Sequence, residues 1–157
     1  RALVARAGTV TRQQLERHIA GMEDVEIVEG ATYDALAASR VALVKSGTST
    51  IEAALIGTPF VVLYRVSSMT FRLAKLLVRG VKHIAMVNVL AGREVVRERL
   101  QNEARGDILA GDLLAIWNGP KRDEVIEGLR DVASRLGEPG MAGRLAAWMV
   151  KRFGNRT

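Results

Sequence analysis

The sequence predicts an α/β fold, in which an open, doubly wound parallel sheet is followed by helices at the carboxyl terminus. Three observations support this fold class. Short β-rich runs alternate with helical stretches every ~15–25 residues, a spacing typical of βαβ units with right-handed crossovers. The run over residues 41–44 is apolar throughout and bounded by turn residues, as expected for a strand buried on both faces of a parallel sheet. After about Gly106, only helical patterns follow.

Each element follows from a local pattern. Short apolar or β-branched runs predict strands over residues 2–5, 25–28, 41–44, 60–64 and 83–87, of which the last is the weakest. Helical patterns predict helices between them over 11–19, 33–39, 49–56 and 69–78, with Gly57 ending the third. Three more helices are predicted over 107–117, 121–136 and 139–153. We therefore expect a Rossmann-like domain over residues 1–105 and an α-helical extension of the same domain over 106–157.

Composition limits the class of protein. The chain has 157 residues, 48% of them hydrophobic, which is enough for one core. It has no cysteine, which excludes disulfides and thiolate metal sites, so we expect a cytoplasmic context. The longest apolar runs have about six residues, far fewer than the ~20 that a membrane-spanning helix needs. Because the chain begins with Arg1 at the edge of a strand pattern, we expect a fragment of a longer protein.

The charge predicts an anionic partner. With 23 Lys and Arg against 17 Asp and Glu, the net charge is +6, which attracts nucleic acid, anionic lipid or phosphorylated small molecules. Aromatic residues make up only 4% of the chain and are scattered, so a platform for stacking bases is not expected, and we do not expect a nucleic acid partner.

The most informative stretch lies between the strand over 41–44 and the helix over 49–56. Small hydroxylated residues and a glycine occupy this turn, namely Ser46, Gly47, Thr48, Ser49 and Thr50. Free backbone N–H groups at the start of a helix stabilise a phosphate, and a glycine allows its close approach. Glu52 would then accept hydrogen bonds from a ribose diol. The alternative is a capping box, in which Ser49 caps the helix and Glu52 only reaches back to it.

Two blocks of sequence carry a family resemblance. Residues 46–67 read SGTSTIEAALIGTPFVVLYRVS, and residues 88–96 read NVLAGREVV, followed by Leu100 and Gln101. Together they resemble the donor-binding segment of lipid-A-disaccharide synthase, a B-fold glycosyltransferase. The helix over 33–39 is similar to the one that precedes the site in that family. The resemblance covers residues 1–105 and implies that this chain is the carboxy-terminal half of the two-domain B fold.

The resemblance implies a reaction and a set of contacts. A UDP-linked diacylated glucosamine would donate its sugar to a diacylated glucosamine 1-phosphate, which releases UDP and forms the lipid A disaccharide precursor. The loop over 46–50 would contact the donor diphosphate, and Glu52 the ribose. The second block would place four further residues on the same nucleotide side, namely Asn88, Arg93, Glu94 and Gln101.

Cationic side chains are expected to take the place of a metal. Arg93 and Lys45 can offset the charge that builds on a departing diphosphate. No cluster of metal-ligating residues accompanies them in the sequence, so we expect neither a metal nor another cofactor.

The family's amino-terminal domain, with its catalytic acidic residue and acceptor surface, has no counterpart in these 157 residues. No catalytic residue is therefore assigned, and we expect the chain to be inactive alone. Arg72, Lys75 and Arg79 form a basic helix face opposite Leu73, Leu76 and Leu77, a pattern typical of a solvated face. The alternative is contact with an anionic membrane surface, which would give a peripheral location on the inner face of the cytoplasmic membrane. The trailing helices are expected to pair between copies of the chain.

Two other functions stay open. The first is another UDP-sugar transferase or an epimerase of the same fold, against which the block from Asn88 to Gln101 argues. The second is not catalytic: a domain that binds a nucleotide or another anion, or a basic module that binds nucleic acid, which a steep salt dependence of binding would reveal.

Overall fold

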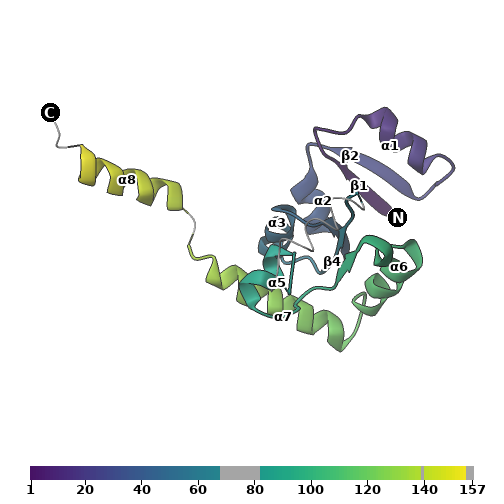
Figure 1. Ribbon diagram of the computed structural model, residues 1–157. Coiled ribbons are helices and arrows are strands. Elements are labelled where there is room, and N and C mark those ends of the chain that lie inside the picture. Colours follow the sequence, from purple (N-terminus) through teal and green to yellow (C-terminus); the bar gives the residue numbers. More distant parts are fainter. Residues whose placement is uncertain (68–81, 139, 155–157) are drawn as a thin grey trace.

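The computed structural model describes residues 1–67, 82–138 and 140–154 of the chain. It confirms the α/β class, since parallel strand pairs are flanked by helices (Figure 1). The helix predicted over 69–78, which carries the basic face of Arg72, Lys75 and Arg79, lies outside the described residues.

The first unit is a pair of parallel strands joined by a helix. β1 (Ala2–Arg6) pairs with β2 (Val25–Glu29), and α1 (Arg12–Ile19) connects them. Thr11 begins α1 with a capping box, because its side chain accepts from the backbone of Gln14 while the Gln14 side chain accepts from the backbone of Thr11. α2 (Thr32–Ala38) then leads toward the next strand. The strands and helices predicted here are confirmed.

The second sheet contains most of the core. Its parallel strands lie in the order β3 (Ala42–Lys45), β4 (Phe60–Tyr64) and β5 (Glu98–Leu100). The central strand β4 buries three consecutive apolar side chains, those of Phe60, Val61 and Val62. α3 (Ser49–Ile56) connects β3 to β4 and ends at Gly57, whose φ of +85° suits a glycine.

Two predictions about these strands are wrong. β3 is not buried on both faces, because Leu43 is 43% exposed while Val44 is 7% exposed. The reason is that β3 lies at an edge and pairs only with β4 among the described residues. The strand predicted over 83–87 is replaced by α5 (Met86–Ala91), which buries Val87 and exposes Met86 and Val89, as an amphipathic helix does.

The two sheets fit a common doubly wound order. In the order 3-2-1-4-5-6, the pair β2 and β1 would correspond to strands 3 and 2, and β3, β4 and β5 to strands 4, 5 and 6. Strand 1 has no counterpart in the described part of the chain. The single continuous sheet that we predicted is therefore found as two parallel pieces.

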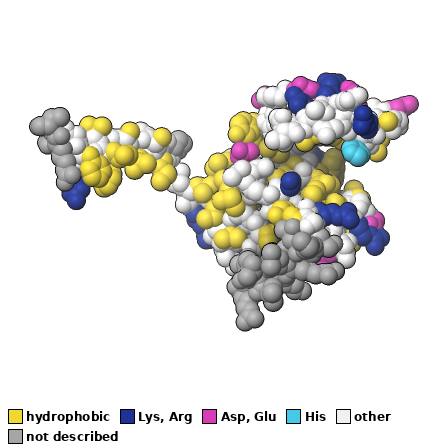
Figure 2. Space-filling view, turned by 45° about the horizontal axis from the view of Figure 1, so that its top comes forward, with side chains coloured by type: hydrophobic (Ala, Val, Ile, Leu, Met, Phe, Trp, Pro, Cys, Tyr) yellow, Lys and Arg dark blue, Asp and Glu magenta, His cyan; other side chains and the backbone are white. Residues whose placement is uncertain are grey.

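The carboxyl-terminal part is helical, as predicted. After η1 (Gln101–Glu103) come α6 (Gly106–Ala115), α7 (Pro120–Arg135) and α8 (Met141–Phe153). α7 packs on α3 and α5 and adds Val125, Leu129 and Val132 to the core. α8 extends away from the body (Figure 1), and hydrophobic side chains lie along it in Figure 2. The division at residue 105 stays a prediction.

We find no helix among the described residues with the length and apolarity that a membrane crossing requires.

Candidate functional site

The loop between β3 and α3 lies at the carboxyl edge of the second sheet. The backbone N–H of Ser46 donates to the carbonyl of Leu63 (2.9 Å), which extends the pairing of β3 with β4 by one bond. Gly47 follows with a φ of +153°, which side-chain-bearing residues rarely adopt. Its carbonyl accepts both the backbone N–H (3.2 Å) and the hydroxyl (2.8 Å) of the fully buried Thr50. The loop is therefore fixed from within.

This loop presents unused hydrogen-bond donors. In the described part of the chain, the backbone N–H groups of Gly47, Thr48 and Ser49 have no protein acceptor. The hydroxyls of Thr48 and Ser49 also lack a partner among those residues. These groups lie at the amino end of α3, where the helix dipole adds positive potential. Consecutive free N–H groups at such a point can bind an anion.

The capping box predicted as the alternative is wrong. Thr48, with φ −59° and ψ −29°, precedes the helix and makes no side-chain cap, while Ser49 is already the first helical residue. The carboxylate of Glu52 instead accepts from the hydroxyl of Tyr33 (3.4 Å), which follows β2. Glu52 is half-buried and Tyr33 is exposed, so the pair lies at the surface beside the loop. Tyr33 was not predicted as a site residue.

Gln101 lies at the same edge, directly after β5. Its side-chain amide forms two hydrogen bonds with Val66, accepting from the backbone N–H (2.8 Å) and donating to the carbonyl (3.0 Å). Gln101 has a φ of +49°, uncommon for a residue other than glycine. The amide therefore holds the segment after β4 beside the end of β5, in the row of loops that contains Ser46.

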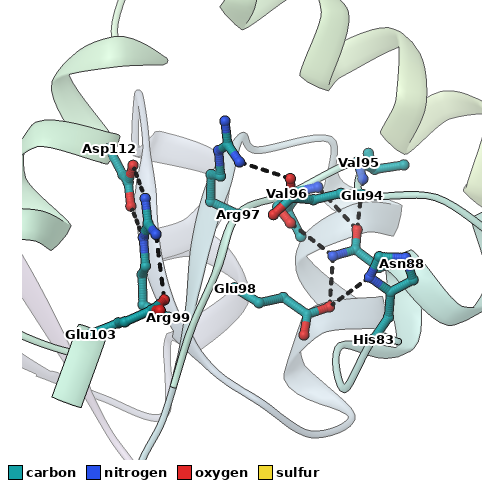
Figure 3. Close-up of polar contacts among 10 residues, drawn as sticks. All are labelled: His83, Asn88, Glu94, Val95, Val96, Arg97, Glu98, Arg99, Glu103 and Asp112. Carbon is teal, nitrogen blue, oxygen red and sulfur yellow. Dashed lines mark hydrogen bonds and ion pairs between the residues drawn. The ribbon is translucent and has the colours of Figure 1, made fainter. Parts of the chain in front are cut away.

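Asn88 is fully buried on α5 (Figure 3). Its Oδ1 accepts from the backbone N–H groups of Val95 (2.7 Å) and Val96 (3.0 Å). Its Nδ2 donates to the carbonyl of Val96 (2.8 Å) and to Oε1 of Glu98 (2.7 Å). Every hydrogen-bonding position of this amide is occupied, so in this structure Asn88 shapes the chain before β5 and has no free group for a ligand.

Arg93 and Glu94 lie at the opposite edge of the sheet. They precede β5, and together with Phe60, the first residue of β4, they line a hollow at the amino ends of the strands. β4 has five residues, so this edge is about 15 Å from the carboxyl edge. Glu94 pairs with Arg97 (2.9 Å). The expectation that all four residues of the second block line one side of the site is therefore not met by Arg93 and Glu94 in this structure.

Glu98 was not among the residues that the sequence predicted for the site. Its side chain is 9% exposed and points from β5 toward Asn88 and His83 (Figure 3). Nδ1 of His83 lies 3.7 Å from Oε1 of Glu98, although no role was predicted for this histidine. No motif marks the carboxylate, because its partners are backbone groups and an amide brought together only by folding.

The opposite face of β5 carries a second polar contact. Arg99 donates through Nε (2.6 Å) and Nη2 (3.0 Å) to the two carboxylate oxygens of Asp112 on α6. These hydrogen bonds hold the pKa of Asp112 below its ordinary value, against a smaller opposing effect of burial. This ion pair connects β5 to α6.

Within residues 1–67, 82–138 and 140–154, no group of three or more His, Asp or Glu side chains is arranged to hold a metal ion.

Comparison with known proteins gives a consistent result. Residues 3–134 match the family model described as lipid-A-disaccharide synthetase. A lipid-A-disaccharide synthase of Syntrophus aciditrophicus is 40% identical over 147 residues, which are 92% of this chain and 38% of that protein. The synthase of Anaeromyxobacter dehalogenans strain 2CP-1 is 41% identical over 143 residues, 89% of this chain and 37% of that protein. The chain thus spans less than two fifths of the length of these relatives.

Proposed function

The chain belongs to the lipid-A-disaccharide synthetase family, and we propose that it forms the part of such a glycosyltransferase that binds the nucleotide-sugar donor. One observation carries this proposal: three free backbone N–H groups at the start of α3 lie at the same sheet edge as the carboxylate of Glu52. Doubly wound sheets bind their ligands at this edge. The arrangement suits a diphosphate joined to a ribose.

Each group has a role in this proposal. The N–H groups of Gly47, Thr48 and Ser49 and the dipole of α3 stabilise the diphosphate, and the hydroxyls of Thr48 and Ser49 add donors. Glu52 accepts hydrogen bonds from the ribose hydroxyls, with Tyr33 holding one carboxylate oxygen. Gln101 fixes the neighbouring loop.

The proposed reaction is the transfer of a diacylated glucosamine from UDP to a diacylated glucosamine 1-phosphate. An acceptor hydroxyl oxygen bonds to the anomeric carbon, and the bond from that carbon to the diphosphate oxygen breaks with inversion. The hydroxyl proton goes to a base, which we place in an amino-terminal domain with the acceptor surface. UDP leaves with a growing negative charge, which preorganised N–H groups stabilise most strongly in the transition state.

Calorimetric titration with UDP and UDP-N-acetylglucosamine tests this proposal, with ADP as the nucleotide control. We expect uridine nucleotides to bind selectively and Glu52→Ala to weaken binding by roughly 10–100-fold, the effect of losing hydrogen bonds to a charged group. Glu16→Gln serves as a control, because among the described residues Glu16 forms an ion pair with Arg12 alone, on the exposed surface of α1. The proposal fails if UDP does not bind, or if it binds equally to the Glu52→Ala variant.

A further inference from the structure

The segment before α5 lies between the candidate diphosphate loop and β5. On one side, the hydroxyl of Ser46 donates to the carbonyl of Ile84 (3.2 Å). On the other side, the backbone N–H of Ile84 donates to Oε2 of Glu98 (2.8 Å). One peptide segment therefore connects the first residue of the loop to a carboxylate on the far strand of the sheet.

The carboxylate of Glu98 is held by several donors at once. Besides Ile84, it accepts from the backbone N–H of Ala85 (3.2 Å) and from Nδ2 of Asn88 (2.7 Å). A carboxylate that is 9% exposed has lost most of its hydration, and donated hydrogen bonds from the protein take its place. Its position is well defined, because Glu98 pairs with Val62 in the β4–β5 ladder.

We infer that Glu98 is a positioning residue for the loop Ser46–Thr50, acting through the carbonyl of Ile84 and the hydroxyl of Ser46. Its relevance to the donor rests on the function proposed above. Glu98 does not face the free N–H groups of the loop. Glu98 fixes the position of Ile84, whose carbonyl accepts the hydrogen bond from Ser46. It thereby fixes the point at which the loop leaves β3.

Glutamine cannot replace Glu98 in this role. Both oxygens of the carboxylate accept from N–H donors, Oε2 from Ile84 and Oε1 from Ala85 and Asn88. A side-chain amide has one oxygen and one NH₂ group, so one of these donors would face another donor. The Glu98→Gln variant therefore changes the hydrogen bonding while keeping the size of the side chain.

Hydrogen–deuterium exchange on the 157-residue chain without nucleotide is the first test. We expect Glu98→Gln to increase exchange in peptides over 84–88 and also in those over 46–52. Val125→Ala, a core substitution beside Phe60 at the amino edge, is the control for general destabilisation and should not single out residues 46–52. Faster exchange confined to residues 84–88 would overturn the inference, and so would an equal increase in both variants.

A double-mutant cycle with UDP is the second test. We expect Glu98→Gln and Ser46→Ala each to weaken UDP binding by roughly tenfold, and the double variant to be little worse than either, because both break one connection. Fully additive effects, or unchanged affinity in Glu98→Gln, would overturn the inference. If the unaltered chain does not bind UDP, the proposed function fails, while the exchange experiment still decides the role of Glu98.

Discussion

At the scale of single residues, the contact between Arg99 and Asp112 predicts how stability depends on pH. The pKa of Asp112 is lowered in the folded chain, chiefly by hydrogen bonds from Arg99. This contribution is present above the ordinary pKa of an aspartate and is lost as the pH falls through the lowered value. Asp112→Asn should therefore lower the free energy of unfolding by roughly 2 kcal/mol at pH 7, and the difference from the unaltered chain should vanish in strong acid.

Urea unfolding from pH 7 down to about pH 2 measures this difference from above the ordinary pKa of an aspartate to well below it. Asp131→Asn is the matched control, because Asp131 pairs with Arg135 one helical turn away on an exposed face and should contribute less than about 0.5 kcal/mol. A difference for Asp112→Asn that stays constant with pH would contradict the assigned cause.

The sequence predicted part of the candidate site, and the limits are visible residue by residue. The loop over 46–50 follows β3 and begins α3 as predicted, because a turn pattern between a strand and a helix is local. Tyr33 and Glu98 were missed because their partners are 19 and 10 positions away, a proximity that only packing creates. Asn88 was noticed, but its burial and its fully bonded amide depend on how α5 lies against β5.

At the scale of elements, close packing of α7 against the segment before β5 requires a glycine. A Cβ at Gly128 would lie 2.6 Å from Cγ1 of Val95, a buried side chain too short to move aside. Gly128→Ala should therefore destabilise the chain by about 1–3 kcal/mol, despite the better helix propensity of alanine. Gly111 on α6 has nothing within 4 Å of such a Cβ, so Gly111→Ala should instead stabilise by roughly 0.5–1 kcal/mol.

Thermal and urea unfolding of both alanine variants measure these opposite signs. Stabilisation by both substitutions would mean that the gain in helix propensity outweighs the contact with Val95 at position 128.

The elements were predicted correctly where a run was clearly apolar or amphipathic, and wrongly where its pattern was ambiguous or absent. The three carboxyl-terminal helices and the strand β4 were predicted, because each has a sustained pattern. The pattern from His83 to Val87 does not distinguish a strand from a helix. In the folded chain, α5 forms with Val87 buried on one face, directly after the buried Ala85. β5 was not predicted, because its three residues are half-buried and two of them are charged, so the sequence has no apolar run there. Its pairing with β4 forms only in the folded chain.

At the scale of the whole molecule, stability is unevenly distributed. The core cluster draws on β3, β4, α3, α5 and α7, and no residue of β1, α1 or β2 belongs to it. Within residues 2–29, all of which the structure describes, Ile27 is the single buried hydrophobic residue. α8 buries no residue and exposes Trp148, Met149 and Val150. Regions with few buried apolar contacts open at low free energy, independently of global unfolding.

Native-state hydrogen exchange should therefore resolve three levels of protection. Peptides from β4 and from residues 125–132 should exchange slowest, those over 2–29 faster, and those over 141–153 fastest, because opening costs less where less apolar surface is buried. Low concentrations of urea should increase the exchange rate of residues 2–29 before they increase that of β4. Equal protection over 2–29 and 60–64 would instead mean that both sheets unfold as one cooperative unit, so that the contact of α2 with both β1 and α3 couples the first sheet to the core.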